Sequence, residues 1–305
     1  MPKQRPNIID YLLLISLAVI FGMSFIFTNI SVLEIPPLTV TAGRVVIALL
    51  ILYPIMRLQK QQLPSVGKIW IYIFLSGLLG NALPFALISW GQIKVDASLA
   101  AIFMAVMPLA TIVLAQFMTD DERINRWKMI AVLLGFLGVI VLMGFDSLSG
   151  LGDETLRQLA ILTAAICYAL NAIVTRKLTS LPKYSMATAL MIAACILILP
   201  FSLVLDQPWK LTPDTNSIAA LVASAIGSTA IATLLILLII DRSGATFLSQ
   251  INFMVPLFGV LFGSLLLSEE LTANAYISLA IIITALFLSR IGANRNPVKQ
   301  ASSNP

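Results

Sequence analysis

Residues 97–119 have the sequence ASLAAIFMAVMPLATIVLAQFMT, an apolar stretch without a charged side chain, and an acidic run beginning at Asp120 follows it directly. A helix of about 20 apolar residues crosses the roughly 30 Å hydrocarbon core of a bilayer. The stretch is therefore long enough to span a membrane as one helix. Because lipid offers the backbone no hydrogen-bond partners, recurrence of such stretches would predict a bundle of membrane-spanning helices.

Similar stretches recur along the chain, and its composition agrees with them. Of the 305 residues, 59% are hydrophobic and 11% are charged, whereas a soluble domain carries about 25% charged residues. The first stretch is longer than a signal-peptide core, so we expect a retained helix there. We predict an all-α integral membrane protein whose ten transmembrane helices lie at residues 9–32, 37–56, 69–92, 97–119, 127–145, 157–175, 184–205, 216–240, 244–267 and 272–289.

Basic residues are divided unevenly between alternate loops. Of the 19 Lys and Arg residues, all but four fall in segments on the same side as the N-terminus. The exceptions are Lys94, Arg157 and Lys210, assigned to the opposite loops, and Arg44 inside the second helix. Cytoplasmic loops hold an excess of Lys and Arg. We therefore predict a multi-pass protein of the inner (cytoplasmic) membrane with both termini in the cytoplasm.

A shift of 148 residues aligns the two halves of the chain. It pairs identical residues, namely Ala97 with Ala245, Pro108 with Pro256, Leu109 with Leu257 and Glu122 with Glu270. Five helices in each half is an odd number, so the second copy must be inverted relative to the first. The prediction is a five-helix repeat at residues 1–147, an inverted five-helix repeat at 148–290 and a cytoplasmic tail at 291–305.

The residues available for chemistry exclude most classes of enzyme. The sequence has no histidine, so histidine-based triads and histidine-bound zinc are impossible. It also lacks a Gly-rich phosphate-binding loop, and its basic residues are not gathered as nucleic-acid binding requires. We predict no enzyme activity, no catalytic residues, no metal and no cofactor. The expected partners are a small-molecule substrate and the lipid bilayer, and the chain could be a monomer or a homodimer.

Polar side chains at bilayer depth are the candidates for a binding site, because they are costly to bury in lipid and mark substrate pathways. Gln250 and Asn252 are two residues apart and would point in different directions, so only one of them should face a cavity. Ser, Thr and Gly inside a span more often serve helix packing. The predicted substrate-binding residues are Ser24, Arg44, Asn81, Phe85, Tyr168, Asn171 and Gln250.

Arg44 and two prolines have alternative interpretations. Arg44 could extend outward to the membrane surface, cap a helix or attract an anionic ligand, and we place it near the outer mouth. Pro108 and Pro256 each remove a backbone hydrogen bond, which makes them packing features or hinges. The acidic pair Glu269–Glu270 is interpreted as a solvated helix start, where negative charge favours the helix that follows.

The stretch NALPFALISWGQ at 81–92, continued by residues 97–123, resembles the EamA-type transporters of the drug/metabolite transporter superfamily. GSTAIA at 227–232 and the run at 244–271 resemble its second copy. Small residues that open the fourth and ninth helices, a central proline and a terminal acid carry the likeness. Arg44 matches an arginine common in the second helix of these proteins, whereas Phe21–Gly22 replaces their frequent Trp–Gly.

The resemblance implies a carrier with a central cavity that commonly exports amino acids, other metabolites or toxic compounds. We therefore predict a secondary transporter of small metabolites that exports them by alternating access. A channel or facilitator is the main alternative, and a membrane enzyme or scaffold is less favoured. Coupling to protons would need acids at helix ends, such as Glu34, Asp96 or Glu270.

Overall fold

The structure is a computed structural model that describes residues 6–119, 124–144 and 152–294. Within these residues ten helical segments are long and apolar enough to cross a membrane, which confirms the predicted ten-helix, all-α membrane fold. The predicted boundary between the halves and most of the predicted tail lie outside the described residues. We number the spans 1 to 10 in order: Ile8–Ser31, Pro37–Leu58, Ile69–Gly91, Ala97–Met118, Arg126–Met143, Asp153–Leu178, Lys183–Asp206, Thr215–Ser243, Ala245–Leu266 and Ala273–Ala293.

Several spans are divided into shorter helical elements. In chain order these elements are α1 (Ile8–Ser31), α2 (Pro37–Leu58), α3 (Ile69–Gly77), η1 (Leu78–Ala82), α4 (Leu83–Gly91), α5 (Ala97–Met104), α6 (Met107–Met118), α7 (Arg126–Met143), α8 (Asp153–Val174), η3 (Thr175–Leu178), α9 (Lys183–Phe201), η4 (Ser202–Asp206), η5 (Pro208–Lys210), α10 (Thr215–Ala223), η6 (Ser224–Ile231), α11 (Ala232–Ser243), α12 (Ala245–Leu248), α13 (Ile251–Leu266) and α14 (Ala273–Asn294). The segments η1, η4 and η6 are π-helical, and η3 and η5 are 3-10 helices.

Side chains beside the helix starts explain where some helices begin. Asn7 accepts a hydrogen bond from the backbone N–H of Asp10, whose carboxylate accepts from the N–H of Asn7 in return. Asn125 accepts from two N–H groups in the first turn of α7. Such caps pair donors that the helix itself leaves free.

Two predicted helix ends were wrong. Span 6 begins at Asp153 rather than at residue 157, so Arg157 lies in the first turns of α8 and not in a loop. Arg157 donates to the Asp153 carboxylate at 3.2 Å and to the Trp90 carbonyl at 2.7 Å, which extends the helix outward. The last helix continues to Asn294, beyond the predicted end at residue 289.

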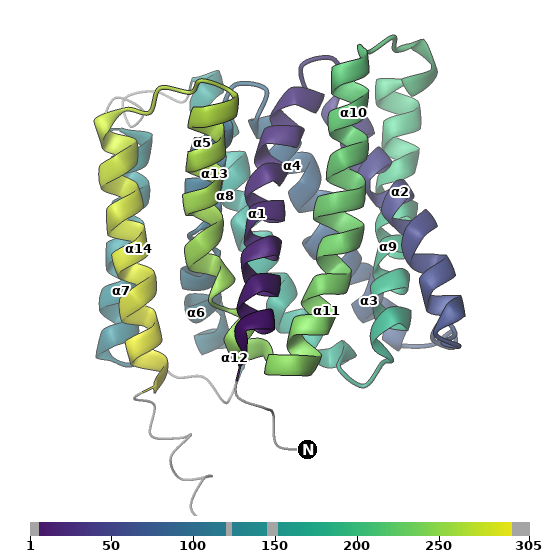
Figure 1. Cartoon of the computed structure of the whole chain (residues 1–305), viewed down its shortest axis with the longest axis horizontal. Helices are drawn as coiled ribbons and strands as arrows, with labels where there is room; N and C mark the ends of the chain where they lie inside the picture. Colours follow the sequence, from purple (N-terminus) through teal and green to yellow (C-terminus); the bar gives the residue numbers. More distant parts are fainter. Residues whose placement is uncertain (1–5, 120–123, 145–151, 295–305) are drawn as a thin grey trace, which may run out of the picture.

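The helices stand side by side, and elements from the two halves interleave (Figure 1). α1 packs against α13, α2 against α9 and η6, and α7 against α14. Gly22 permits the first of these contacts, because a Cβ atom at that position would lie 2.7 Å from Cβ of Phe258. The start of α1 and the end of α14 lie at the same face of the bundle, as an even number of crossings requires.

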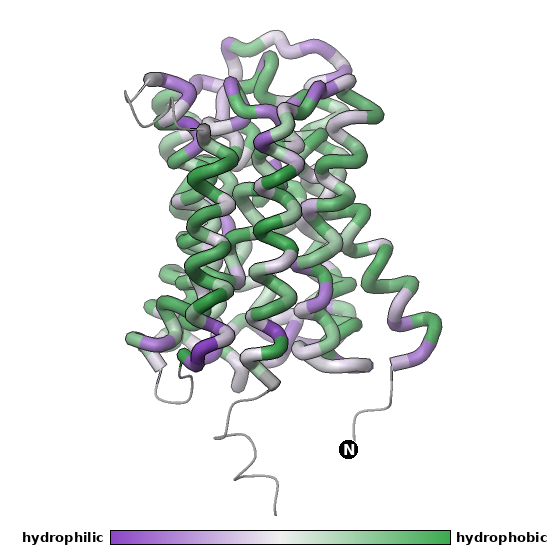
Figure 2. The backbone as a smooth tube through the Cα atoms, turned by 90° about the vertical axis from the view of Figure 1, so that its left-hand side faces the viewer, coloured by the Kyte–Doolittle hydropathy of each residue, from purple (hydrophilic) through white to green (hydrophobic). Residues whose placement is uncertain are grey.

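The surface divides into an apolar middle and polar ends, as a bilayer demands. Figure 2 shows hydrophobic residues along the middle of the helices and hydrophilic residues gathered toward the two ends. Large apolar side chains such as Leu133, Phe136 and Phe287 are exposed on the outer helices α7 and α14. In a soluble protein so many exposed apolar side chains would cause association, whereas lipid solvates them.

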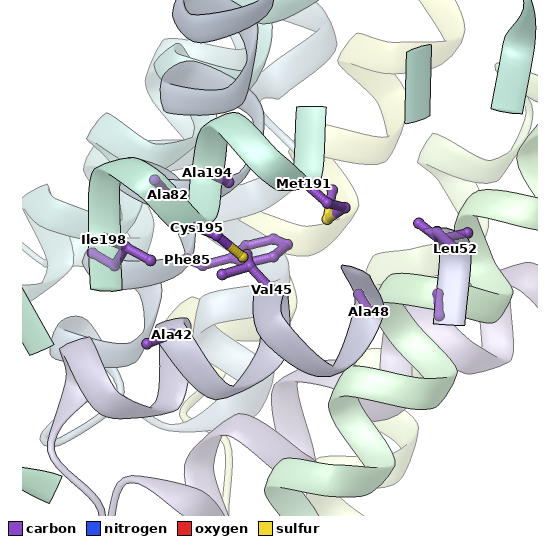
Figure 3. Close-up of a cluster of buried hydrophobic side chains, with 11 residues drawn as sticks. Ala42, Val45, Ala48, Leu52, Ala82, Phe85, Met191, Ala194, Cys195 and Ile198 are labelled. Atoms are coloured by element: carbon purple, nitrogen blue, oxygen red, sulfur yellow. The ribbon is translucent and has the colours of Figure 1, made fainter. Parts of the chain in front are cut away.

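Small side chains let α2 and α9 approach closely. Ala42, Val45 and Ala48 of α2 face Ala194 and Cys195 of α9 in one buried cluster, which Figure 3 shows around the ring of Phe85. Interfaces of this kind are typical of membrane helices, where packing rather than hydrophobic exclusion drives association. This contact holds one helix of each half beside the centre of the bundle.

Candidate functional site

A cavity of about 390 Å³ lies between helices of the two halves. Its volume is within the range of small-molecule sites, roughly 300 to 1,000 Å³. Apolar side chains form much of the wall, and the polar lining residues are Ser24, Thr28, Arg44, Asn81, Tyr168, Ser228, Thr229, Thr233 and Asn252. Every polar group in that set except the Arg44 guanidinium is uncharged at neutral pH.

Five of the seven predicted binding residues line this cavity. They come from separate elements: Ser24 from α1, Arg44 from α2, Asn81 from η1, Phe85 from α4 and Tyr168 from α8. The folded chain thus brings together side chains that the sequence separates widely. Their roles toward a substrate remain a proposal, which we develop below.

Asn171 does not line the cavity, contrary to the prediction. Its side-chain oxygen accepts hydrogen bonds from the hydroxyls of Ser76 and Thr175, the latter at 3.1 Å. The backbone of Gly80 lies directly against its amide, leaving no room for a Cβ atom there. Asn171 therefore joins α8 to span 3 as a packing residue.

Asn252 lines the cavity, whereas Gln250, the residue that we selected, does not. Only one of the two was expected to face a cavity, and this part of the prediction agrees with the structure. Gln250 lies in the turn between α12 and α13, whereas Asn252 lies in the first turn of α13. The prediction assumed the regular helical rotation of about 100° per residue, and this rotation applies only to the residues that follow the turn.

Arg44 is buried inside the bundle, with a residue exposure of 4%. The prediction that it extends outward to the membrane surface is therefore wrong, whereas its position near the outer mouth stays a prediction. Its Nε donates to the Thr229 hydroxyl, its Nη1 to the Thr28 hydroxyl and its Nη2 to the Ser24 hydroxyl, each at 3.4 Å. The guanidinium carbon lies 4.0 Å from the centre of the Phe85 ring, which places a cation over an aromatic face.

These contacts leave Arg44 with much of its donor capacity unused. Ordinary N–H···O bonds measure about 2.7 to 3.2 Å, so each Arg44 contact is long. The acceptors are neutral hydroxyls, and no carboxylate among the described residues is paired with Arg44. Arginine keeps its charge in proteins, and a buried charge without a counter-ion is costly. The cavity wall therefore contains one buried positive charge without a negatively charged partner among the described residues.

Thr28 and Thr229 were assigned to helix packing by sequence, and the structure places both beside Arg44. Thr28 donates its hydroxyl hydrogen to the Ser24 carbonyl at 2.8 Å, and Thr229 donates to the Ser224 carbonyl at 3.4 Å. Their oxygen lone pairs are then free to accept from the guanidinium. Two signals could have identified them: Thr28 follows Ser24 by one turn, and the 148-residue shift superposes Thr229 on Asn81.

Two π-helical segments shape the polar wall. Asn81 lies in η1 and Thr229 in η6, and the 148-residue shift places residues 78–82 over residues 226–230. At the end of η1 the N–H of Leu83 donates to the carbonyl of Leu78, five residues back instead of four. Such segments occur frequently at functional sites. The regular helix is thus interrupted beside the cavity at positions that the 148-residue shift pairs.

The sequence model of the EamA-like transporter family matches residues 8–144 and 156–291, which together make up most of the chain. This chain belongs to the EamA-like transporter family. As a member, it is a transporter rather than an enzyme, as the absence of a catalytic constellation led us to expect.

Relatives of this EamA-like transporter are similar over nearly their whole length. The uncharacterized transporter YoaV of Bacillus subtilis is 21% identical over 93% of this chain and 98% of its own. A probable amino-acid metabolite efflux pump of Escherichia coli is 26% identical, with 96% and 99% covered. The uncharacterized inner membrane transporter YedA of Escherichia coli is 24% identical, with 94% and 92% covered. With its ten apolar spans, the chain is a multi-pass inner membrane protein.

A solved crystal structure has the same fold as the EamA-like chain. The two superpose with a TM-score of 0.67 at 16% sequence identity, over 95% of this chain and 99% of the other. At that identity the likeness establishes the fold alone. It supports the ten-helix arrangement in which the cavity lies.

The two prolines of this EamA-like transporter occupy different places. Pro108 is in the first turn of α6, just after a turn at Ala105–Val106, and does not line the cavity. Pro256 lies inside α13 and does line it. Span 4 is therefore broken immediately before its proline, whereas span 9 is broken one turn or more before its proline, at Ser249–Gln250.

Glu269 caps a distant helix and not the helix that follows it, which corrects the prediction for the acidic pair. Its carboxylate accepts from the backbone N–H of Ala97 at 2.8 Å, from the N–H of Ser98 at 3.0 Å and from the Ser98 hydroxyl. The α13–α14 connection thereby holds the start of α5. The corresponding acids of the first half, residues 120–122, lie outside the described residues.

Proposed function

We propose that this chain is a secondary transporter that exports small metabolites by alternating access. The observation that carries the proposal is the cavity between the halves, where a buried arginine without an anionic partner faces a ligand-sized space. A relative is named as a probable amino-acid metabolite efflux pump, which supports both the class of cargo and the export direction.

The proposed substrate site consists of Ser24, Arg44, Asn81, Phe85 and Tyr168, to which the structure adds Thr229 and Asn252. Arg44 would hold a charged or strongly polar end of the substrate. The amides of Asn81 and Asn252 would pair with polar groups that a substrate loses from water, because unpaired polar groups are costly to bury. Phe85 would keep the guanidinium in place.

Alternating access would follow from two inverted repeats, 1–147 and 148–290, that rock about the cavity. The matching positions of η1 and η6 support this internal repeat, as do the two segments matched by the family model. We further propose that Pro108 and Pro256 act as hinges, since Pro108 directly follows the break in span 4 and Pro256 removes a backbone donor inside α13.

We propose that the face bearing both termini is cytoplasmic. The excess of basic residues on that side supports this orientation. Cysteine-accessibility labelling in intact cells tests it, with a single cysteine placed in the 149–152 loop or in the 179–182 connection. Labelling of the first and protection of the second is expected, and the opposite pattern would invert the topology.

Counterflow in vesicles containing the purified chain tests the transport function. Vesicles preloaded with one unlabelled compound are diluted into the same compound in labelled form, using amino acids, their deaminated acids and their acetylated derivatives in turn. A carrier should accumulate label transiently and saturate with concentration, whereas a channel should only equilibrate it. Absence of accumulation for every compound would count against the proposal.

A further inference from the structure

We propose that the cavity selects small organic monocarboxylates that carry no positively charged amine. The inference rests on the transport function proposed above and specifies its substrate class. It derives from the balance of charge in the cavity wall, where Arg44 provides one fixed cation and no lining residue provides a fixed anion.

A carboxylate fits the unused hydrogen-bonding capacity of Arg44. The guanidinium contacts neutral hydroxyls at 3.4 to 3.5 Å and no carboxylate among the described residues. A carboxylate can accept two parallel N–H bonds from a guanidinium at shorter distance, and charge strengthens both bonds. An anionic ligand would thus supply the counter-ion that the folded chain lacks.

An ammonium group has no comparable partner in the cavity. Binding it as an ion pair would need a carboxylate, and the lining contains neither Asp nor Glu, so only weaker contacts with aromatic faces such as those of Phe21, Phe25 and Tyr168 remain. The Phe85 ring already has the Arg44 guanidinium over one face, 4.0 Å from its centre. Two positive charges in a poorly hydrated space repel strongly, because the effective dielectric constant is low. Zwitterionic amino acids are therefore expected to bind worse than the corresponding acids without the amine.

The remaining wall favours an apolar body of limited size. Phe21, Phe25, Met104, Ile251 and Val255 line the cavity. A volume of about 390 Å³ accommodates a single aromatic or branched aliphatic group next to the carboxylate. The chemical class is thus a small aromatic or branched monocarboxylate.

The experiment compares four probes of similar size on the purified full-length protein. They are 3-phenylpropanoate, its zwitterionic amino derivative phenylalanine, the neutral 3-phenylpropanamide and the cation 3-phenylpropylamine. 4-Methylpentanoate and leucine form a second, aliphatic pair. Thermal stabilisation and competition against labelled 3-phenylpropanoate give their relative affinities at neutral pH. We expect each carboxylate to bind at least tenfold more tightly than its matched zwitterion and than the neutral amide.

Substitutions of arginine then test the source of that selectivity. Arg44→Gln should abolish the preference for carboxylate over amide, and Arg44→Lys should weaken binding while keeping the preference. Arg57→Gln, at the exposed end of the same helix, should bind all probes as the unaltered protein does. If Arg44→Gln is poorly folded, the probe series on the unaltered protein and Arg44→Lys still decides.

The proposal is overturned if phenylalanine binds as tightly as 3-phenylpropanoate, if neither monocarboxylate binds, or if a folded Arg44→Gln keeps the preference. Those outcomes leave the transport function intact when counterflow of another compound is observed. Failure of counterflow for every compound overturns the transport function instead, so the two failures are distinguishable.

Discussion

The two halves of the chain share a scaffold but supply different chemistry to the cavity. The 148-residue shift superposes Arg44 on Ile192, Asn81 on Thr229 and Phe85 on Thr233. At these three positions the first half provides the charge, an amide and an aromatic ring, and the second half provides an aliphatic side chain and two hydroxyl groups. An internal repeat can place similar helices on both sides of a central site and so give access from each membrane face. Because the side chains of the two halves differ, the site itself can still bind a substrate in one orientation.

The halves also differ in where a central helix is interrupted. In span 4, the N–H groups of Ala105 and Val106 bond to carbonyls three residues back, immediately before Pro108. In span 9 the same type of tight turn falls at Gln250, well before Pro256. Matching prolines therefore do not guarantee matching breaks.

Replacing the charged Arg44 should have the largest effect, and it tests most directly whether the two halves supply different chemistry to the cavity. Arg44→Gln is expected to lower the initial counterflow rate at least tenfold, since hydrogen bonds to a charged group contribute about 1.5 to 3 kcal/mol. Ile192→Gln makes the corresponding change in the second half and should leave the rate within about twofold. Equal losses in the two variants would mean that both halves contribute equally.

The proline substitutions should have the next largest effect and address the second difference. We expect Pro108→Ala and Pro256→Ala to lower the maximal transport rate several-fold, because restored N–H groups would stiffen the helices where the halves move. Paired measurements of binding and initial rate should show unchanged affinity for Pro108→Ala. A modest loss of affinity is expected for Pro256→Ala, since this proline lines the cavity. Normal rates in both variants would leave the prolines as packing residues.

A smaller effect should come from the matched polar pair in η1 and η6. Asn81→Ala and Thr229→Ala should each weaken substrate binding about fivefold, since a hydrogen bond is worth about 1 kcal/mol. Asn171→Ala is the control, because its amide bonds within the protein. It should lower the unfolding temperature without changing the affinity per folded molecule. Weakened binding in that control would return Asn171 to the substrate site.

The smallest effect should come from Asp96, which precedes α5. Loss of solvent raises the pKa of its carboxyl above the ordinary value of 3.8, and repulsion from Glu269 and Glu154 adds to the increase. The folded protein thus disfavours the ionised form of Asp96. The free energy of unfolding therefore falls by this contribution as the pH rises from 3.8 through the raised pKa of the folded state. Asp96→Asn should slightly raise the unfolding temperature at neutral pH.

Thermal unfolding of Asp96→Asn across a pH series measures this contribution. The gain over the unaltered protein should vanish at pH values below 3.8, where the carboxyl is protonated in both states. Glu34→Gln removes an exposed negative charge elsewhere and serves as the control. A gain that persists at low pH would point to helix capping by asparagine rather than to the removed charge.

Sequence could predict the ten spans because each needs only an uncharged stretch of sufficient length. Their ends were less predictable where a charged side chain finds a partner in the fold. Considered in the sequence alone, Arg157 was assigned to a loop, but Trp90 and Asp153 accept its hydrogen bonds in α8. Trp90 lies far away in the sequence, so no local pattern indicates it, whereas Asp153 is one helical turn before Arg157 and could have been recognised.

Helical spacing predicted part of the cavity lining but could not predict which side chains neighbouring elements cover. Tyr168 and Asn171 lie three residues apart and so share one face of α8. Ser76 and Gly80 pack against Asn171, however, so that only Tyr168 of this pair lines the cavity. Gln250 was misplaced because the turn before α13 interrupts the helical spacing. The role of Glu269 depends on the neighbouring start of α5, which sequence separation conceals.

The π-helical turn η1 has a consequence for how this protein can change over generations. A π turn amounts to one extra residue accommodated in an α-helix, so deleting one residue there would restore the regular ladder. Phe85 and the residues beyond it would then keep nearly their present direction, because the wide turn already absorbs the extra residue. The deletion would instead remove one position of the polar wall around Asn81 while leaving span 3 long enough to cross the membrane. Length variation among related genes at this position would therefore report on the wall of the cavity rather than on membrane insertion.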